Sequence, residues 1–159
     1  MSENMTHEEA VAVWHESRLR VPLFEVDIGQ AVYHGNYFHL FEMARENFLR
    51  DLGYPYRRFM EQQLHLTIVE TSCSYRRSLH YDDHIEVQTR VLWWRRRSLA
   101  FAQNIQRRAE EDNTKVLCTE ATFKMVCVRF SGAPTILPLD FVHLLQEYQS
   151  EDLISKTQE

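Results

Sequence analysis

One helical pattern, between Asn36 and Gly53, limits the folds open to this chain more than any other feature. Apolar residues recur there at the three- and four-residue spacing of a single helix face: Tyr37, Leu40, Phe41, Ala44 and Phe48. Asn36 is a favoured N-cap residue, and Gly53 is the residue type that ends helices. Phe38 and Met43 lie off this stripe, so the apolar surface is broad and predicts a buried helix.

Strand patterns surround this helix. A short alternating segment containing Pro22 precedes it, and longer ones follow at 64–76, 84–94, 98–108 and 115–130. Pro22 favours a sheet edge for the short segment, and a slip in the alternation near Val69 predicts a bulge. Alternation within 84–94 predicts one shared face for five residues: Ile85, Val87, Thr89, Val91 and Trp93.

The order of these elements predicts an α+β fold. One helix is central to five strands only if the antiparallel sheet curls around it. A curled sheet leaves two edge strands, and pairing across a two-fold axis is one way to satisfy them. We therefore expect at least a dimer.

The ends of the chain are expected to lie outside the main domain. Residues 1–16 are predicted to form an extension or a short helix, and residues 17–148 the domain itself. A second amphipathic helix is expected after Pro138, with one apolar face made of Phe141, Leu144, Leu145 and Tyr148. Residues 149–159 are expected to be a tail.

Composition narrows the class of protein. The 159 residues carry 18 Lys and Arg against 23 Asp and Glu, and this net charge of −5 argues against a dedicated nucleic-acid binder. The three cysteines lack C-x-x-C spacing and are expected to be reduced, packed thiols. The sequence has no signal-peptide pattern and no apolar run long enough to span a bilayer, which predicts a cytoplasmic protein.

Asp27 and His34 lie just ahead of the buried helix. A helix N-terminus carries free backbone N–H groups and a partial positive charge, which can hold a carbonyl oxygen as it becomes an oxyanion. The carboxylate of Asp27 could activate a water as a general base or attack a carbonyl carbon directly. Two plainer interpretations stay open: Asp27 as a turn residue bonding its own backbone, and His34 acting through its backbone alone.

The segment around this helix resembles the hotdog-fold acyl-CoA thioesterases of the 4-hydroxybenzoyl-CoA thioesterase type, and most of all their Tol–Pal-associated branch. That branch carries a pattern like D-x-D-x-x-G-x-V-Y-H-x-N-Y, then E-x-A-R and L-G. The matching residues are Glu25, Asp27, Val32, Tyr33, His34, Asn36 and Tyr37, then Glu42, Ala44 and Arg45, then Leu52 and Gly53. The resemblance covers roughly residues 17 to 148.

The resemblance implies a hotdog fold: a five-stranded antiparallel sheet wrapped around one long central helix, with a C-terminal helix, in a homodimer or homotetramer. It implies hydrolysis of an acyl-CoA thioester, with Asp27 as the catalytic carboxylate and the His34 backbone N–H polarising the carbonyl. The substrate-binding residues would be Tyr33, Gly35, Asn36 and Tyr37. No metal or other cofactor is implied, and coenzyme A enters only as part of the substrate.

Two departures from the family pattern bear on the loop that holds Asp27. Glu25 replaces the usual first Asp. Gln30 stands where the pattern usually has Gly, and if that Gly has a positive φ, Gln at this position costs stability or alters the turn.

Arginine-rich segments are candidates for the phosphates of coenzyme A. Arg96, Arg97 and Ser98 follow two tryptophans, a combination that could also stack on RNA or be a solvated hairpin tip. The segment Tyr75–Arg77 is a weaker candidate for the same task. His80 to His84, HYDDH, has the residue types of a metal site, but a turn entering a strand would fan these side chains apart.

Other functions remain as alternatives. Because a fold alone does not fix function, a non-catalytic acyl-thioester-binding or scaffold protein is the main one. A hydratase or dehydratase acting on acyl thioesters is another. The sequence contains no G-x-S-x-G and no phosphate-cradling glycine loop, which argues against a serine hydrolase or a nucleoside-triphosphate enzyme.

Overall fold

A computed structural model describes residues 14–156 of the chain. Its strands are β1 (His15–Arg20), β2 (Leu64–Tyr75), β3 (His84–Trp94), β4 (Ser98–Arg108) and β5 (Lys115–Arg129). Its helices are α1 (Tyr37–Leu52), α2 (Arg57–Glu61) and α3 (Leu139–Lys156), with single 3₁₀ turns η1 (Leu23–Glu25) and η2 (His34–Asn36). Most of the short helix suggested for residues 1–16 lies outside the described residues.

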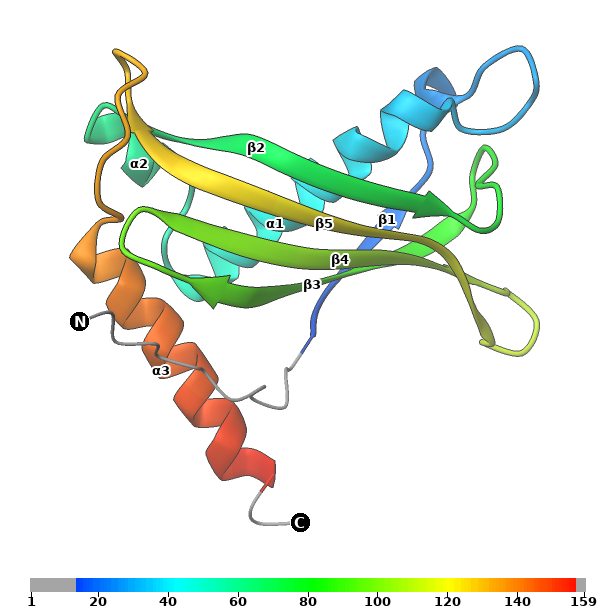
Figure 1. Cartoon of the computed structure of the whole chain (residues 1–159). Helices are drawn as coiled ribbons and strands as arrows, with labels where there is room; N and C mark the ends of the chain where they lie inside the picture. The colour runs from blue at the N-terminus through cyan, green and yellow to red at the C-terminus, as the bar shows by residue number, and fades with distance from the viewer. Residues whose placement is uncertain (1–13, 157–159) are drawn as a thin grey trace.

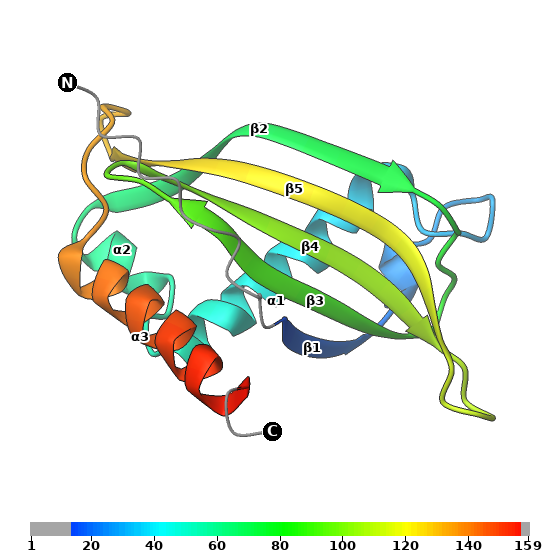
Figure 2. The same ribbon diagram turned by 60° about the horizontal axis from the view of Figure 1, so that its bottom comes forward.

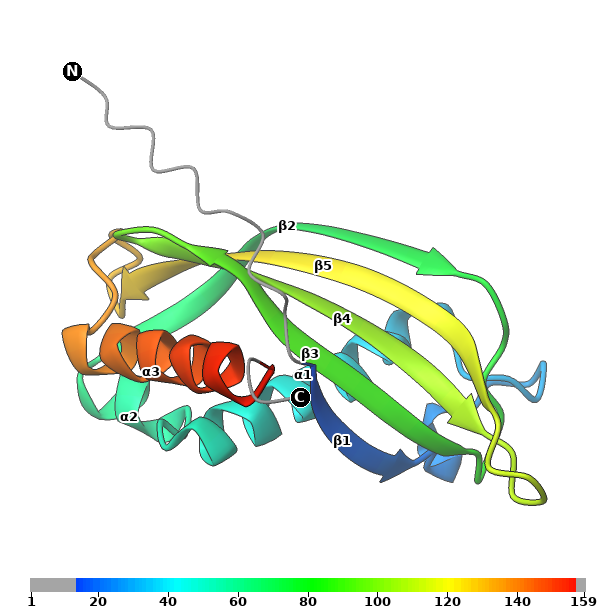
Figure 3. The same ribbon diagram turned by 90° about the horizontal axis from the view of Figure 1, so that it is seen from below.

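The five strands form one antiparallel sheet in the order β1-β3-β4-β5-β2, and the sheet curves around α1 (Figures 1, 2 and 3). This confirms the predicted α+β hotdog arrangement with one central helix. Five residues of the predicted helix stripe are at most 3% exposed: Tyr37, Leu40, Phe41, Ala44 and Phe48. Full burial of a Phe side chain contributes about 2–3 kcal/mol, so this stripe anchors the core.

The ends of α1 differ in how they are capped. Gly53 adopts φ 90° and donates its N–H to Arg50 O at 3.0 Å, as predicted for a helix-ending glycine. Asn36 occupies the predicted N-cap position of α1 but does not act as a side-chain cap. It is in a helical conformation within η2, and its side chain donates instead to the carbonyl of Glu25 at 3.2 Å.

The bounds of the four long strands agree closely with the prediction, and the bulge near Val69 is confirmed by a register shift between Ile68 and Glu70. A second bulge, between Val91 and Trp93, is not signalled by the sequence. It brings Trp93 opposite Ala100 on β4, so Trp93 leaves the face that it was predicted to share with Val91.

The first strand and the segment after α1 also differ from expectation. β1 ends at Arg20, before Pro22, because proline ends its ladder and begins the η1 turn. Residues 54–63, where the sequence shows neither a helical nor a strand pattern, contain the five-residue helix α2, whose Phe59 is fully buried. None of the helices in the described part of the chain is long and apolar enough to cross a bilayer.

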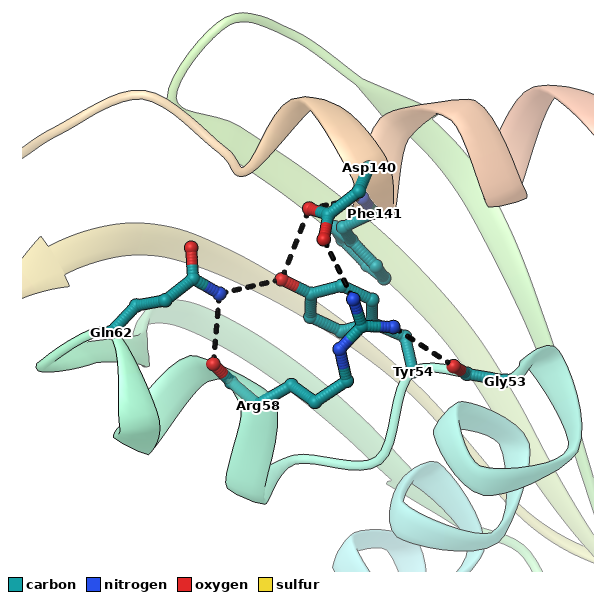
Figure 4. Close-up of polar contacts among 6 residues, drawn as sticks. All are labelled: Gly53, Tyr54, Arg58, Gln62, Asp140 and Phe141. Atoms are coloured by element: carbon teal, nitrogen blue, oxygen red, sulfur yellow. Dashed lines mark hydrogen bonds and ion pairs between the residues drawn. The ribbon is translucent and has the colours of Figure 1, made fainter.

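A polar cluster attaches α3 to the end of α1 (Figure 4). Tyr54, buried beneath α3, donates its hydroxyl to Asp140 Oδ1 at 3.2 Å and accepts a bond from Gln62 Nε2 at 2.8 Å. Arg58 donates to Asp140 Oδ2 at 2.8 Å, and its guanidinium lies 4.2 Å from the centre of the Tyr54 ring. Burial raises the pKa of the Tyr54 phenol.

Asp140→Ala is expected to lower the free energy of unfolding by about 1–2 kcal/mol, because it removes the acceptor for both Tyr54 and Arg58. Asp140→Asn is the matched control. It keeps an acceptor for Tyr54 and loses mainly a half-exposed ion pair, for an expected loss below about 1 kcal/mol. Urea unfolding of both variants measures the difference, and equal losses would contradict this role for the Tyr54 bond.

Candidate functional site

A short loop carries Asp27. A β-bridge between Val26 and Val32 closes the loop, and Asp27 donates its N–H to Ala31 O at 3.0 Å. The Asp27 carboxylate accepts the N–H of Gly29 through Oδ1 at 2.8 Å, which is the turn interaction considered for this residue. Oδ2 has no hydrogen-bond partner in the described part of the chain. One oxygen of an exposed carboxylate is thereby fixed and the other is free to meet water or substrate.

Gly29 keeps the Asp27 carboxylate in place by its lack of a side chain. A Cβ at residue 29 would lie 3.0 Å from Asp27 Oδ1, inside normal contact distance. The next residue, Gln30, adopts φ 64°. The sequence indicated that Gln at this position is costly if the backbone has a positive φ, and the structure confirms that backbone.

Gln30→Gly is expected to raise the free energy of unfolding by about 0.5–1 kcal/mol, because glycine adopts a positive φ without a Cβ clash. Gln30→Ala is the matched control, since it shortens the side chain and keeps the Cβ. Thermal and urea unfolding of both variants test this. If Gln30→Ala is stabilised as much as Gln30→Gly, the gain comes from loss of the Gln side chain. That result would contradict the explanation from the backbone conformation.

The segment from Tyr33 to Asn36 turns the chain into α1. Its first backbone hydrogen bond runs from Asn36 N–H to Tyr33 O at 2.8 Å. The N–H groups of His34 and Gly35 precede that bond and have no acceptor among the described residues. They are the free donors that a helix N-terminus offers. The structure thus places two backbone donors where the sequence predicts an oxyanion site.

Side chains of the predicted site residues take different positions. The ring of His34 is exposed and lies 4.2 Å, centre to centre, from the ring of Tyr33. A Cβ on Gly35 would come within 3.0 Å of the Tyr33 ring, so glycine permits this close approach. Tyr37 is buried in the core, where its hydroxyl accepts the N–H of Leu79 at 3.1 Å.

Glu25 holds the start of α1 from the loop side. Its carbonyl accepts the N–H of Tyr33 at 3.0 Å and the side-chain amide of Asn36. Its buried carboxylate lies 3.0 and 3.1 Å from Nδ1 of His39, one turn into the helix. The sequence identified Glu25 only as a departure from a family pattern, and no local spacing signals its contact with a residue 14 positions away.

Tyr75 holds the start of α1 from the sheet side. Its hydroxyl donates to the carbonyl of His34 at 2.6 Å, and its ring packs edge-on against Tyr37 at 4.9 Å. Sequence reasoning assigned Tyr75 only a weak role in phosphate binding. The contact with His34 spans 41 residues and depends on the sheet curling, so no sequence pattern reveals it.

Arg96, Arg97 and Ser98 lie at the β3–β4 connection, at the opposite end of the sheet from η2 (Figure 1). Their backbone is held, because Leu137 N–H donates to Arg96 O at 2.9 Å and Cys127 N–H to Arg97 O at 2.8 Å. Both guanidinium groups are exposed. Within one protomer the structure does not bring these residues together with Asp27 and His34.

A pocket of about 430 Å³ also lies at that far end, lined by residues that include Gln62, Leu64, Arg129 and Phe130. None of the predicted catalytic or substrate-binding residues lines it. Its described lining residues include no carboxylate or histidine, so the pocket lacks the general base that a hydrolytic site needs.

Of two neighbouring arginines near the Asp27 end of the sheet, one is held in an ion pair. Arg76 forms an ion pair with Glu120 at 2.6 Å, whereas the exposed guanidinium of Arg77 has no ion-pair partner in the described residues. The HYDDH segment fans apart only in part. Asp82 pairs with Arg20 and His84 with Glu110, whereas Asp83 stays with His80, whose N–H it accepts at 2.8 Å. No group of three metal-ligating side chains is found among the residues that the structure describes.

The site therefore combines a carboxylate with one free oxygen and a helix start with two free N–H groups, both at one end of α1. A bound carbonyl compound could place its oxygen against the N–H groups while water or the carboxylate approaches its carbon. This is the chemistry of acyl transfer to water.

Comparison with known proteins agrees with this chemistry. Residues 21–145 match the model of the thioesterase-like superfamily. The acyl-CoA thioester hydrolase YbgC of Escherichia coli O6:H1 is 31% identical over 125 residues, which cover 78% of this chain and 90% of that protein. An Aquifex aeolicus protein named as an esterase is 41% identical over 70 residues. That match covers 44% of this chain and 55% of the relative, so the chain spans about half of that protein's length.

A solved structure has the same architecture. The 4-hydroxybenzoyl-CoA thioesterase from Pseudomonas sp. strain CBS-3 superimposes with a TM-score of 0.74, over 82% of this chain and 98% of that one. The two sequences are 22% identical, so this likeness shows the shared fold alone.

Proposed function

Because the chain belongs to the thioesterase-like superfamily and is homologous to acyl-CoA thioesterases, we propose that it hydrolyses an acyl-CoA thioester to the free acid and coenzyme A. The observation that carries this proposal is the placement of the Asp27 carboxylate and the free N–H groups of His34 and Gly35 at one end of α1.

In the proposed reaction, the thioester carbonyl accepts hydrogen bonds from the helix start, which stabilises the oxyanion as the tetrahedral intermediate forms. Loss of one such donor typically costs about 3 kcal/mol. The free oxygen of Asp27 has two routes open to it. As a general base it takes a proton from the attacking water, and the tetrahedral intermediate then expels the coenzyme A thiolate, which receives that proton. As a nucleophile it attacks the carbonyl carbon and expels the thiolate, and water then cleaves the resulting anhydride to the free acid and the Asp27 carboxylate.

One observation favours a second candidate function. The Asp27 carboxylate bonds the N–H of Gly29, as an ordinary turn residue does. A protein that binds acyl thioesters without cleaving them, on the same fold, would need no more than this turn and the helix start.

We further propose that the chain acts as a dimer built on β2. This edge strand has twelve residues, contains no proline and carries a single acidic residue, Glu70. Ile68, Val69 and Tyr75 are 42–54% exposed along it. A long, weakly charged edge of this kind pairs readily with another strand. Sedimentation at twice the 19.1 kDa chain mass is expected for the dimer, and at four times that mass for a tetramer.

The dimer supports the predicted role of Arg96, Arg97 and Ser98. If β2 pairs antiparallel with β2 of a second subunit across a two-fold axis, the two sheets run in opposite directions. Opposite ends of the two subunits then lie side by side. The β3–β4 connection of one subunit then lies at the same end of the joined sheet as the Asp27 loop of the other. We propose that these arginines hold the phosphates of a coenzyme A whose thioester is at the partner's site.

Three finer assignments stay proposals: membership of the Tol–Pal-associated branch, a cytoplasmic location, and a domain spanning residues 17–148. The first is supported by the 31% identity to YbgC. The second rests on the three free cysteines, which suit a reducing compartment. The third is slightly shorter than the elements of the structure, because β1 already begins at His15 and α3 continues to Lys156.

Free-thiol release from a panel of acyl-CoAs tests the proposed activity. The panel spans short aliphatic, long aliphatic and aromatic acyl groups, each offered also as a carrier-protein thioester. Turnover of one class is expected. Folded protein that binds these esters and cleaves none of them would overturn the proposal in favour of the binding function, and water addition to an enoyl-CoA would favour a hydratase.

A further inference from the structure

The peptide group between His34 and Gly35 contributes one of the two donors of the proposed oxyanion site. This group is planar and trans, so its C=O and N–H point in opposite directions as one rigid unit. Whatever fixes the carbonyl of His34 therefore fixes the direction of the Gly35 N–H.

Tyr75 is bonded to that carbonyl. Its hydroxyl donates to His34 O at 2.6 Å, a short and well-placed bond. A hydrogen bond accepted by the C=O of a peptide group polarises the group and strengthens the bond donated by its N–H. Tyr75 thus approaches the peptide from the sheet side and leaves the N–H of Gly35 facing the opposite way.

The phenol is itself held in place. Residue 75 pairs with Thr119 at the end of β2, and its ring packs edge-on against Tyr37 at 4.9 Å. Tyr37 is in turn buried and bonded to Leu79 N–H. Partial burial of this phenol, with a contribution from Cys73, raises the pKa of Tyr75 to about 12, so the hydroxyl keeps its proton and remains a donor at neutral and mildly alkaline pH.

We propose that Tyr75 is a positioning residue of the thioesterase site, which orients and polarises the His34–Gly35 peptide so that the Gly35 N–H stabilises the oxyanion. This rests on the proposed function. Tyr75 does not touch the reacting atoms, and it acts only through the peptide group. Its effect is therefore expected on the transition state and not on the binding of substrate.

Tyr75→Phe keeps the ring against Tyr37 and removes the hydroxyl. We expect kcat to fall roughly three- to tenfold, less than the ~10²–10³-fold loss on removing an oxyanion donor outright, with KM unchanged within about twofold. Tyr81→Phe is the matched control. Tyr81 is an exposed tyrosine of the β2–β3 connection, and its loss of a hydroxyl is expected to leave kcat unchanged.

The amide resonance of Gly35 gives a readout that does not depend on turnover. In Tyr75→Phe the ¹H and ¹⁵N shifts of Gly35 should move upfield, and those of Gly132, a glycine outside the site, should stay in place. Unmoved Gly35 shifts would overturn the proposal. So would a rise in KM at constant kcat, because that result would mean that Tyr75 contacts the substrate.

A second variant guards against misfolding of Tyr75→Phe. 3-Fluorotyrosine at position 75 keeps the bond and makes the hydroxyl a stronger donor, so kcat at or above the wild-type value is expected. A kcat lowered as far as in Tyr75→Phe would contradict the proposal. If the wild type cleaves no thioester, the proposed function fails, yet the Gly35 shifts still decide whether Tyr75 polarises this peptide.

Discussion

Asp27→Asn is expected to lower the kcat of acyl-CoA hydrolysis by about 10²–10⁴-fold, because the amide can neither take a proton from water nor attack the carbonyl. The amide oxygen still accepts the N–H of Gly29, so the loop should keep its shape. Substrate affinity, measured by calorimetry with an uncleaved ester, should therefore stay within about threefold of the wild type.

Asp112→Asn is the matched control for this loss. Asp112 makes the same type of turn bond, from Thr114 N–H to its Oδ1 at 3.1 Å, in the β4–β5 connection. Its replacement should leave kcat unchanged. Wild-type kcat in Asp27→Asn would mean that Asp27 is a turn residue only, and would move the catalytic role elsewhere.

The second large effect is expected in the core, where Arg45 is only 8% exposed. Its Nη1 donates to Gln103 Oε1 at 2.9 Å, and its guanidinium lies 4.3 Å from the centre of the Phe123 ring. Gln103 Nε2 donates in turn to Phe41 O and Thr89 Oγ1. Burial lowers the pKa of Arg45 to about 10, and nearby glutamates oppose part of this decrease. The lowered pKa means that burial destabilises the charged form of the guanidinium.

Gln103→Leu is expected to lower the free energy of unfolding by about 3–5 kcal/mol, because it leaves a buried cation without its acceptor. Gln106→Leu, on the same strand and half-buried, should change it by about 0.5 kcal/mol or less. Denaturant unfolding gives both values.

A double variant separates the lost acceptor from mere disruption of packing. Adding Arg45→Met to Gln103→Leu replaces both polar partners by apolar groups, which is often neutral or stabilising. The double variant is therefore expected to regain most of the loss. A double variant less stable than Gln103→Leu would contradict the view that the unpaired charge of Arg45 causes the loss of stability in Gln103→Leu.

Much of the fold follows from local sequence pattern. The helix stripe, the four long strands and the bulge at Val69 depend on periodicity and on residues such as Gly53, which act within a few positions of themselves. The bulge at Val91 escapes such reasoning because the pattern there is apolar on both sides of the slip. Helix α2 is too short to show a period, and tertiary contacts such as that of Phe59 with Phe141 of α3 hold it in place.

The proposed site was predictable only in part. Asp27 and His34 follow from their place before a helix and from a family pattern. The groups that hold the helix start in position do not. Glu25 meets His39, and Tyr75 meets His34, only because the loop and the curled sheet return to the same helix end. Such contacts depend on the tertiary fold, and neither residue type nor spacing in the sequence predicts them.

The most direct test of the proposed site is a crystal structure of Asp27→Asn with an uncleaved acyl-CoA bound. The thioester oxygen is expected about 2.7–3.1 Å from the N–H of His34 or Gly35, with the side chain of residue 27 beside the carbonyl carbon. A thioester bound elsewhere, or with its oxygen turned away from the start of α1, would contradict this account.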